Sequence, residues 1–215
     1  MRQRIRRWLI NYLSLNGASK RVSGSSARGE WSEFFLRPRR PSTPPSPVKL
    51  KSMLDPTATR IIDWLRQIGL TVRLAALETG TFLPGVTLEP GGLIVDPERL
   101  LYSGDLLHEA GHLATMLPSR RASTGSNAGS DMGDEIAAQT WSYAAAVHLG
   151  LAPEIVFHST GYHESAARLI EIYRDGKAGV PLLQWMGLTL DSTRAAACSL
   201  PAYPHMIRWL RAEDD

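Results

Sequence analysis

The chain has 215 residues, with 24 lysines and arginines against 21 aspartates and glutamates and a net charge of +3. That length suits one domain with an appendage. No apolar run is long enough to cross a bilayer, and the single cysteine, Cys198, excludes an intramolecular disulfide framework and a cysteine zinc cluster. We therefore expect a soluble cytoplasmic protein in which Cys198 is a small buried residue.

Charge is distributed unevenly along the chain. Residues 1–51 contain twelve of the 24 basic residues and only two acids, so they carry +10 and leave −7 for residues 52–215. The basic pI of 9.2 is thus a property of the tail and does not make the folded part a nucleic-acid binder. We expect residues 1–52 to be a disordered, basic, Pro/Ser-rich tail and linker, or the product of a start assigned upstream of Met53. Membrane or nucleic-acid contact through this tail stays open.

Ordered structure is predicted from Asp55, which can cap a helix that has Pro56 in its first turn and ends at Gly69. Isoleucines and a leucine recur along it at helical spacing. Three β-like stretches follow, residues 71–77, 81–88 and 92–96, separated by glycine-containing turns. They predict a small sheet of about three strands.

The next stretch, residues 105–115, reads Asp-Leu-Leu-His-Glu-Ala-Gly-His-Leu-Ala-Thr and predicts a helix over about 104–117. Residues four apart lie on one face of a helix, so His108 and His112 would direct two imidazoles at one point, as a zinc ion requires. Glu109 would reach a water beside the metal and act as general base. The competing interpretation is a buried helix whose two histidines bind no metal, but burying both without a partner is unfavourable.

Further helices complete the predicted domain, residues 53–215. A polar, glycine-rich loop over 118–133 precedes a helix from Asp134 to Gly150. The remaining helices are expected at about 153–158, 164–174, 181–186 and 204–211, with Trp185, Ile207 and Trp209 in the core. The predicted class is α+β, mainly helical, with the small sheet before the His-Glu-x-x-His helix.

Zinc held by two histidines needs a third protein ligand. Glu135, at the start of the next helix, is our first candidate, and Asp134 and Asp131 are the alternatives. A hydrogen-bond donor for the developing oxyanion is also expected. Tyr162 is the leading candidate for that role, and the other candidates are His163, His158, Tyr143 and His148.

The segment from Gly104 to Leu149 resembles zincins whose third ligand is a glutamate, most of all the ImmA/IrrE family of metallopeptidases. The matching positions are His108, Glu109, His112 and Glu135, followed by Ala138 and Trp141. The resemblance covers about residues 82–150 and implies a zincin-like fold. Thr115 and Pro118 exclude the metzincin branch, and Gln139 stands where the thermolysin branch has an aspartate.

The resemblance implies a small zinc metallopeptidase acting on a peptide or protein substrate. A second hypothesis is a non-catalytic or regulatory zincin-fold protein whose basic tail docks a partner, membrane or nucleic acid. A third is a hydrolase of another bond, because the motif does not specify the scissile bond.

Overall fold

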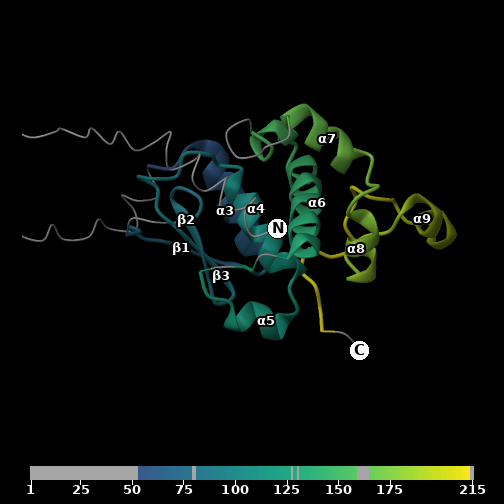
Figure 1. Ribbon diagram of the computed structural model, residues 1–215, viewed down its shortest axis with the longest axis horizontal. Helices are drawn as coiled ribbons and strands as arrows, with labels where there is room; N and C mark the ends of the chain where they lie inside the picture. Colours follow the sequence, from purple (N-terminus) through teal and green to yellow (C-terminus); the bar gives the residue numbers. More distant parts are fainter. Residues whose placement is uncertain (1–52, 79–80, 127, 130, 159–164, 214–215) are drawn as a thin grey trace, which may run out of the picture. The chain divides into compact units, whose positions relative to one another are not determined.

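A computed structural model (Figure 1) describes residues 53–78, 81–126, 128–129, 131–158 and 165–213. All of them belong to a single unit of the chain, Thr43–Asp215. The predicted tail and linker, residues 1–52, lie outside the described residues. The elements in chain order are α3 (Pro56–Gln67), β1 (Thr71–Leu74), β2 (Val86–Glu89), β3 (Gly92–Val95), α4 (Asp105–Thr115), α5 (Pro118–Ser123), α6 (Met132–His148), the 3-10 turn η1 (Pro153–Ile155), α7 (Ala166–Arg174), α8 (Val180–Trp185) and α9 (Ser192–Cys198). The predicted α+β class with a three-stranded sheet is confirmed.

Helix α3 begins as the sequence predicts. The Asp55 carboxylate accepts hydrogen bonds from the backbone N–H groups of Thr57 (2.7 Å) and Ala58 (2.9 Å), which the first turn otherwise leaves unpaired. Its apolar stripe is buried against the rest of the domain. The helix stops before Gly69, whose φ of 101° suits a residue without Cβ.

The sheet has the order β1-β3-β2, with β3 parallel to β1 and antiparallel to β2. Thr71 pairs with Gly92, and Val86 pairs with Val95. The second strand is shorter than the predicted 81–88, because the chain turns at Gly85. This glycine has a φ of 77°, and a Cβ on it would lie 2.2 Å from the backbone nitrogen of Leu100. Only glycine fits this turn.

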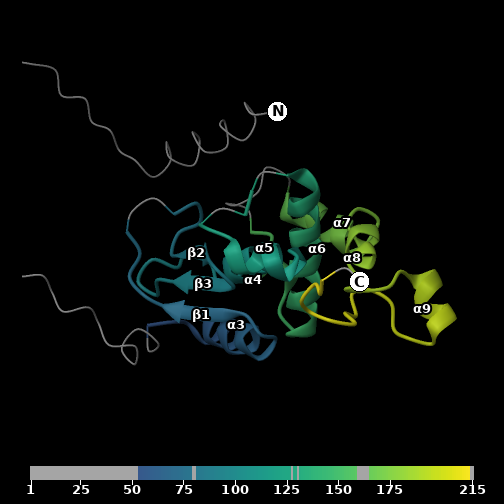
Figure 2. The same ribbon diagram turned by 90° about the horizontal axis from the view of Figure 1, so that it is seen from below.

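Helices α4 and α6 pack side by side, with the sheet on one side of the pair and α7 and α8 on the other in both views (Figure 1, Figure 2). Every residue of α4 is buried, and α6 is buried from Ala137 to Ala146. Gly111 permits the close approach, because a Cβ there would lie 2.6 Å from the backbone oxygen of Ala138. The Ser142 hydroxyl donates to the backbone oxygen of Leu107 across the same contact. The predicted metal-binding helix is thus part of the core.

The loop predicted over residues 118–133 is partly helical. Helix α5 occupies its first six residues, and α6 begins at Met132 rather than at Asp134. Pro118 suits the first turn of α5, and the Arg121 guanidinium donates to the backbone oxygens of Leu113 and Met116. These bonds hold the polar segment against the end of α4.

The C-terminal prediction is wrong in three respects. Residues 204–211 form no helix, because their backbone groups bond to other segments: the Arg211 N–H donates to Ala114 and the Ile207 N–H to Leu188. Helix α9 was not expected, and its Cys198 is exposed instead of buried. Trp185 and Ile207 are also exposed, at 70% and 46%, although Trp209 packs against the core.

The other predicted helices exist with altered bounds. The one expected at 153–158 is the three-residue turn η1, whereas α7 and α8 lie close to their predicted positions. Ser165 caps α7 by accepting from the backbone N–H of Arg168. No helix of the described residues has the length and apolar character needed to cross a membrane.

Candidate metal centre

The His-Glu-x-x-His motif lies within α4, as predicted. Because α4 is buried on all sides, its polar side chains are enclosed: His108 is 7%, Glu109 8% and His112 8% exposed. Enclosed imidazoles and carboxylates require partners, since burying them alone is unfavourable. The partner of the two histidines comes from α6.

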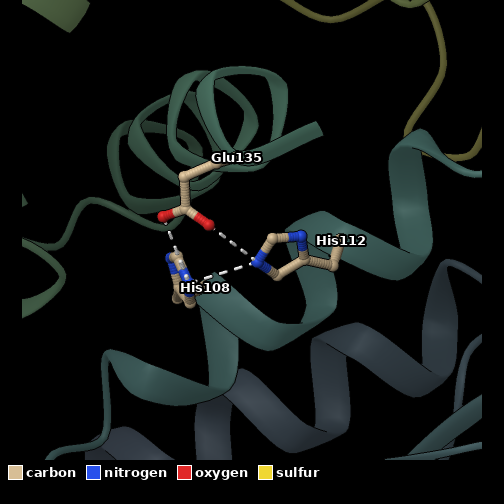
Figure 3. A group of neighbouring side chains, drawn as sticks. All are labelled: His108, His112 and Glu135. Carbon is tan, nitrogen blue, oxygen red and sulfur yellow. Dashed lines mark hydrogen bonds and ion pairs between the residues drawn. The ribbon is translucent and has the colours of Figure 1, made fainter. Parts of the chain in front are cut away.

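Glu135, in the first turn of α6, faces both histidines (Figure 3). The Nε2 atoms of His108 and His112 are 3.3 Å apart. Glu135 Oε2 lies 3.3 Å from Nε2 of His112, and Oε1 lies 3.7 Å from Nε2 of His108. One ligand atom from each residue falls within 4.8 Å of the others, so these three side chains could hold a metal ion.

The spacing agrees with a tetrahedral ion. Two ligand atoms that each lie about 2.1 Å from a tetrahedral zinc are about 3.4 Å apart. The His108–His112 and His112–Glu135 distances, both 3.3 Å, match this value. Two imidazole nitrogens and one carboxylate oxygen also form a donor set that zinc accepts, with a fourth position left for water. The residues present therefore fit zinc.

Glu135 supplies the negative charge of the candidate site. Burial disfavours the ionised form of Glu135, yet the charges of both histidines and hydrogen bonds from His112 and Gln139 lower its pKa to about 2. Burial lowers the pKa of His108 and also opposes the charged form of His112, but Glu135 raises the pKa of His112 above its usual value. At neutral pH an ionised carboxylate thus faces two imidazoles, which are metal ligands in their neutral form.

Access to the site is from the Glu135 side. The Glu135 side chain is 42% exposed, whereas those of His108 and His112 are only 8% and 9% exposed. The more exposed side of the site is therefore at the start of α6, and the two histidines lie deeper.

Glu109 is the fourth polar group of the motif. Burial, together with the charges of Asp105 and Glu135, raises its pKa to about 7, although His112 acts in the opposite direction. A carboxyl group whose pKa lies near the working pH is suited to accept and return a proton. The predicted general base therefore lies in an environment that favours this role.

The structure assigns other partners to the alternative third ligands. Asp131 caps α6 by accepting from the backbone N–H groups of Gly133 and Asp134. The Asp134 carboxylate forms an ion pair with Arg120 at 3.0 Å. Of the three predicted candidates, only Glu135 is brought to the histidines.

The candidates for the oxyanion donor lie in different parts of the chain, and two of them lie outside the described residues. Tyr162, the first choice, and His163 lie outside the described residues. His148 packs against both Trp64 and Trp209 at the far end of α6, with ring centroids 5.7 and 4.9 Å away. Tyr143 stacks on a neighbouring tyrosine ring. These contacts give His148 and Tyr143 packing roles.

His158 lies near the candidate ligands. Its Nε2 is 3.0 Å from Oδ1 of Asp105, which precedes His108 by one helical turn. Its ring stacks on Tyr102 at 3.9 Å, and the charges of His158 and Asp105 both affect the pKa of His108. Of the predicted donors in the described part of the chain, His158 is the one that lies near the candidate metal ligands.

Comparisons of the chain with protein-family models, with curated proteins and with solved structures each found no match. They neither support nor contradict the resemblance to the ImmA/IrrE family. A function for this chain therefore depends on the chemistry and geometry of its own side chains.

Two residues behind Glu135 were not predicted as part of the site. Gln139 donates from Nε2 to Glu135 Oε1 at 2.5 Å, and the Tyr173 hydroxyl donates to Oε1 of Gln139. Gln139 is four residues after Glu135, so helical spacing alone could have identified it. Tyr173 lies on α7, and no sequence pattern connects it to α6.

Proposed function

We propose that this protein is a zinc-dependent hydrolase, a small metallopeptidase that cleaves peptide bonds in a peptide or protein substrate. The observation that carries the proposal is the convergence of Glu135 from α6 on His108 and His112 from α4, at distances suited to a tetrahedral metal. This is the ligand set expected of a glutamate-type zincin. We also propose that the fold is zincin-like and similar to that of the ImmA/IrrE family.

Zinc bound by these three residues would lower the pKa of water towards neutrality and polarise the substrate carbonyl. Glu109 supplies the proton transfers: it takes a proton from the attacking water and then delivers it to the leaving amine. Its raised pKa in the buried site allows both steps near neutral pH. His158, whose Nε2 lies 3.0 Å from Oδ1 of Asp105, is the proposed hydrogen-bond donor to the substrate.

The first test is the metal content of the purified full chain by mass spectrometry. Wild type is expected to contain one zinc per chain, and His108→Ala, His112→Ala and Glu135→Ala are each expected to lose it. His205→Ala is the matched control, because His205 is exposed and lies outside the site. A wild-type protein that takes up no zinc even when it is added would contradict the metal centre.

The second test separates an enzyme from a metal-stabilised binding protein. Glu109→Gln should keep the zinc and reduce cleavage of a peptide library by about 10²–10⁴-fold, the usual contribution of a general base. Glu171→Gln is the matched control, since Glu171 is exposed and forms an ion pair with Arg168 on its own helix. Equal activity of wild type and Glu109→Gln would contradict the proposed mechanism. Zinc binding without cleavage in wild type would favour the non-catalytic alternative.

A further inference from the structure

A chain of hydrogen bonds leads from the candidate metal ligand Glu135 into the core. Gln139 Nε2 donates to Glu135 Oε1, and the hydroxyl of Tyr173, on α7, donates to Gln139 Oε1. Both supporting side chains are buried, Gln139 at 8% and Tyr173 at 4% exposure. Tyr173 is itself held by stacking on Phe157, with ring centroids 5.3 Å apart. A buried row of hydrogen bonds of this kind fixes the orientation of its side chains, because leaving any of these polar groups unpaired would cost free energy.

The hydrogen bonds from Tyr173 through Gln139 to Glu135 all donate in the same direction. A carboxylate that binds a metal only accepts hydrogen bonds, so the amide must present its N–H group to Glu135. The amide oxygen then faces Tyr173 and needs a donor, which the phenol supplies. Burial raises the pKa of Tyr173, so the phenol remains protonated and able to donate. An amide turned the other way would place its oxygen against the carboxylate. Tyr173 thus favours the Gln139 orientation that supports an ionised Glu135.

The hydrogen bond distinguishes the two oxygens of Glu135. Oε1 accepts the hydrogen bond from Gln139 and lies 3.7 Å from Nε2 of His108, whereas Oε2 lies 3.3 Å from Nε2 of His112, the separation expected of two ligands on one zinc. A carboxylate that bound through both oxygens would occupy an additional coordination position. That position is the one a hydrolase keeps open for water.

We infer that Gln139 and Tyr173 are positioning residues that keep Oε1 of Glu135 in a hydrogen bond. Oε2 alone then binds the metal, and the fourth coordination position stays open. This inference rests on the metal centre of the proposed function. Both residues act through Glu135 and contact neither substrate nor metal. Partners of this kind typically contribute about 10–100-fold to metal affinity.

The test uses the full chain loaded with Co²⁺, whose visible absorption is strong in four-coordinate sites and weaker at higher coordination number. Zinc affinity is measured in parallel by competition with a chromophoric chelator. Gln139→Leu removes the donor, so we expect about 10–100-fold weaker zinc binding and a weaker cobalt absorption as Oε1 also coordinates. Tyr173→Phe should change both readouts in the same direction by a smaller amount.

Tyr203→Phe is the matched control for Tyr173→Phe. The Tyr203 hydroxyl also donates to α6, but to the backbone oxygen of Thr140, away from the ligand. Its removal should leave zinc affinity and the cobalt spectrum unchanged. A role of Tyr173 limited to packing α7 on α6 would make the two tyrosine variants behave alike.

Two results would overturn the inference, and they distinguish a failure of the metal centre from a failure of the positioning role alone. If wild type binds neither zinc nor cobalt, the metal centre fails and the positioning role fails with it. If wild type binds both but Gln139→Leu and Tyr173→Phe keep its affinity and spectrum, only the positioning role fails. Should Gln139→Leu not fold by circular dichroism, the milder Tyr173→Phe decides between the outcomes.

Discussion

The paired helices α4 and α6 are buried along most of their length, whereas α9, near the end of the chain, buries only Ala195. The candidate metal ligands all lie on the first pair. Side chains on mutually packed helices hold their positions more accurately than side chains on exposed segments. The comparison shows that the candidate metal ligands lie in a well-packed part of the described domain, away from the exposed α9.

Burial does not simply decline towards the C-terminus. Beyond α9, the backbone oxygen of Trp209 accepts from Trp141 Nε1 at 2.9 Å, and the Arg211 N–H donates to Ala114 at 2.8 Å. The segment after α9 therefore returns to the end of α4 and the middle of α6 and stabilises them. This contrast between a buried helix pair and an exposed α9 can be tested by matched substitutions.

The largest contrast is expected between two tryptophans. Trp141→Ala removes a fully buried side chain and its hydrogen bond to Trp209, so the free energy of unfolding should fall by about 3–5 kcal/mol. Trp185→Ala removes a ring that is 70% exposed and contacts the Arg211 guanidinium at 4.6 Å. Its cost should be about 1 kcal/mol or less. Urea denaturation measures both, and similar losses would contradict the comparison.

A smaller effect is expected from a single methyl group between the two buried helices. A Cβ at position 111 would lie 2.6 Å from the backbone oxygen of Ala138, so Gly111→Ala must separate α4 from α6. The cost should be about 1–3 kcal/mol, and zinc affinity should fall as Glu135 moves from the histidines. Gly125→Ala is the control, because its Cβ would contact nothing within 4 Å. Unchanged zinc affinity in Gly111→Ala would show that the ligand geometry tolerates the shift.

The N-caps of α6 and α9 provide a third comparison. Asp131 and Asp191 each accept from the backbone of their own helix, Asp131 from Gly133 at 2.7 Å and Asp191 from Arg194 at 2.9 Å. Asp131→Ala should lower the free energy of unfolding by about 1 kcal/mol. Asp191→Ala should instead increase amide hydrogen exchange in α9 and leave global unfolding unchanged. Equal effects on global unfolding would mean that α9 folds together with the core.

The smallest effect concerns the response of α9 to pH. The backbone hydrogen bond from Arg194 and the side-chain bond with Gln184 lower the pKa of Asp191. Because the folded-state pKa is lowered, the cap is fully present above the ordinary aspartate pKa and is lost as pH falls through the lowered value. The protection factors of the α9 amides, which correct the exchange rate for its intrinsic dependence on pH, should therefore fall at acid pH in wild type. In Asp191→Ala these protection factors should lack this acid-dependent fall.

Local rules were enough to predict α3, α4, most of α6 and the three strands. Each has a signal within a few residues: the cap Asp55, the helical spacing of apolar residues in α4, or the turn glycines between strands. The same rules failed after Leu188, where an extended segment takes its hydrogen bonds from α4 and α6 and where α9 lacks an apolar face to predict it. Trp185 shows the limit most clearly, since an aromatic residue is usually buried and this one is not.

The amino-acid sequence by itself determined that His108 and His112 share one face of a helix and that Glu109 lies beside them, because helical geometry relates residues three and four apart. Only the tertiary structure decided which acid joins them. Asp131, Asp134 and Glu135 are neighbours in sequence, and the packing of α6 on α4 at Gly111 directs Glu135 alone to the histidines. Tyr173, from a separate helix, enters the same network through Gln139. Contacts between helices depend on how whole surfaces fit together, and no short pattern in the chain encodes that fit.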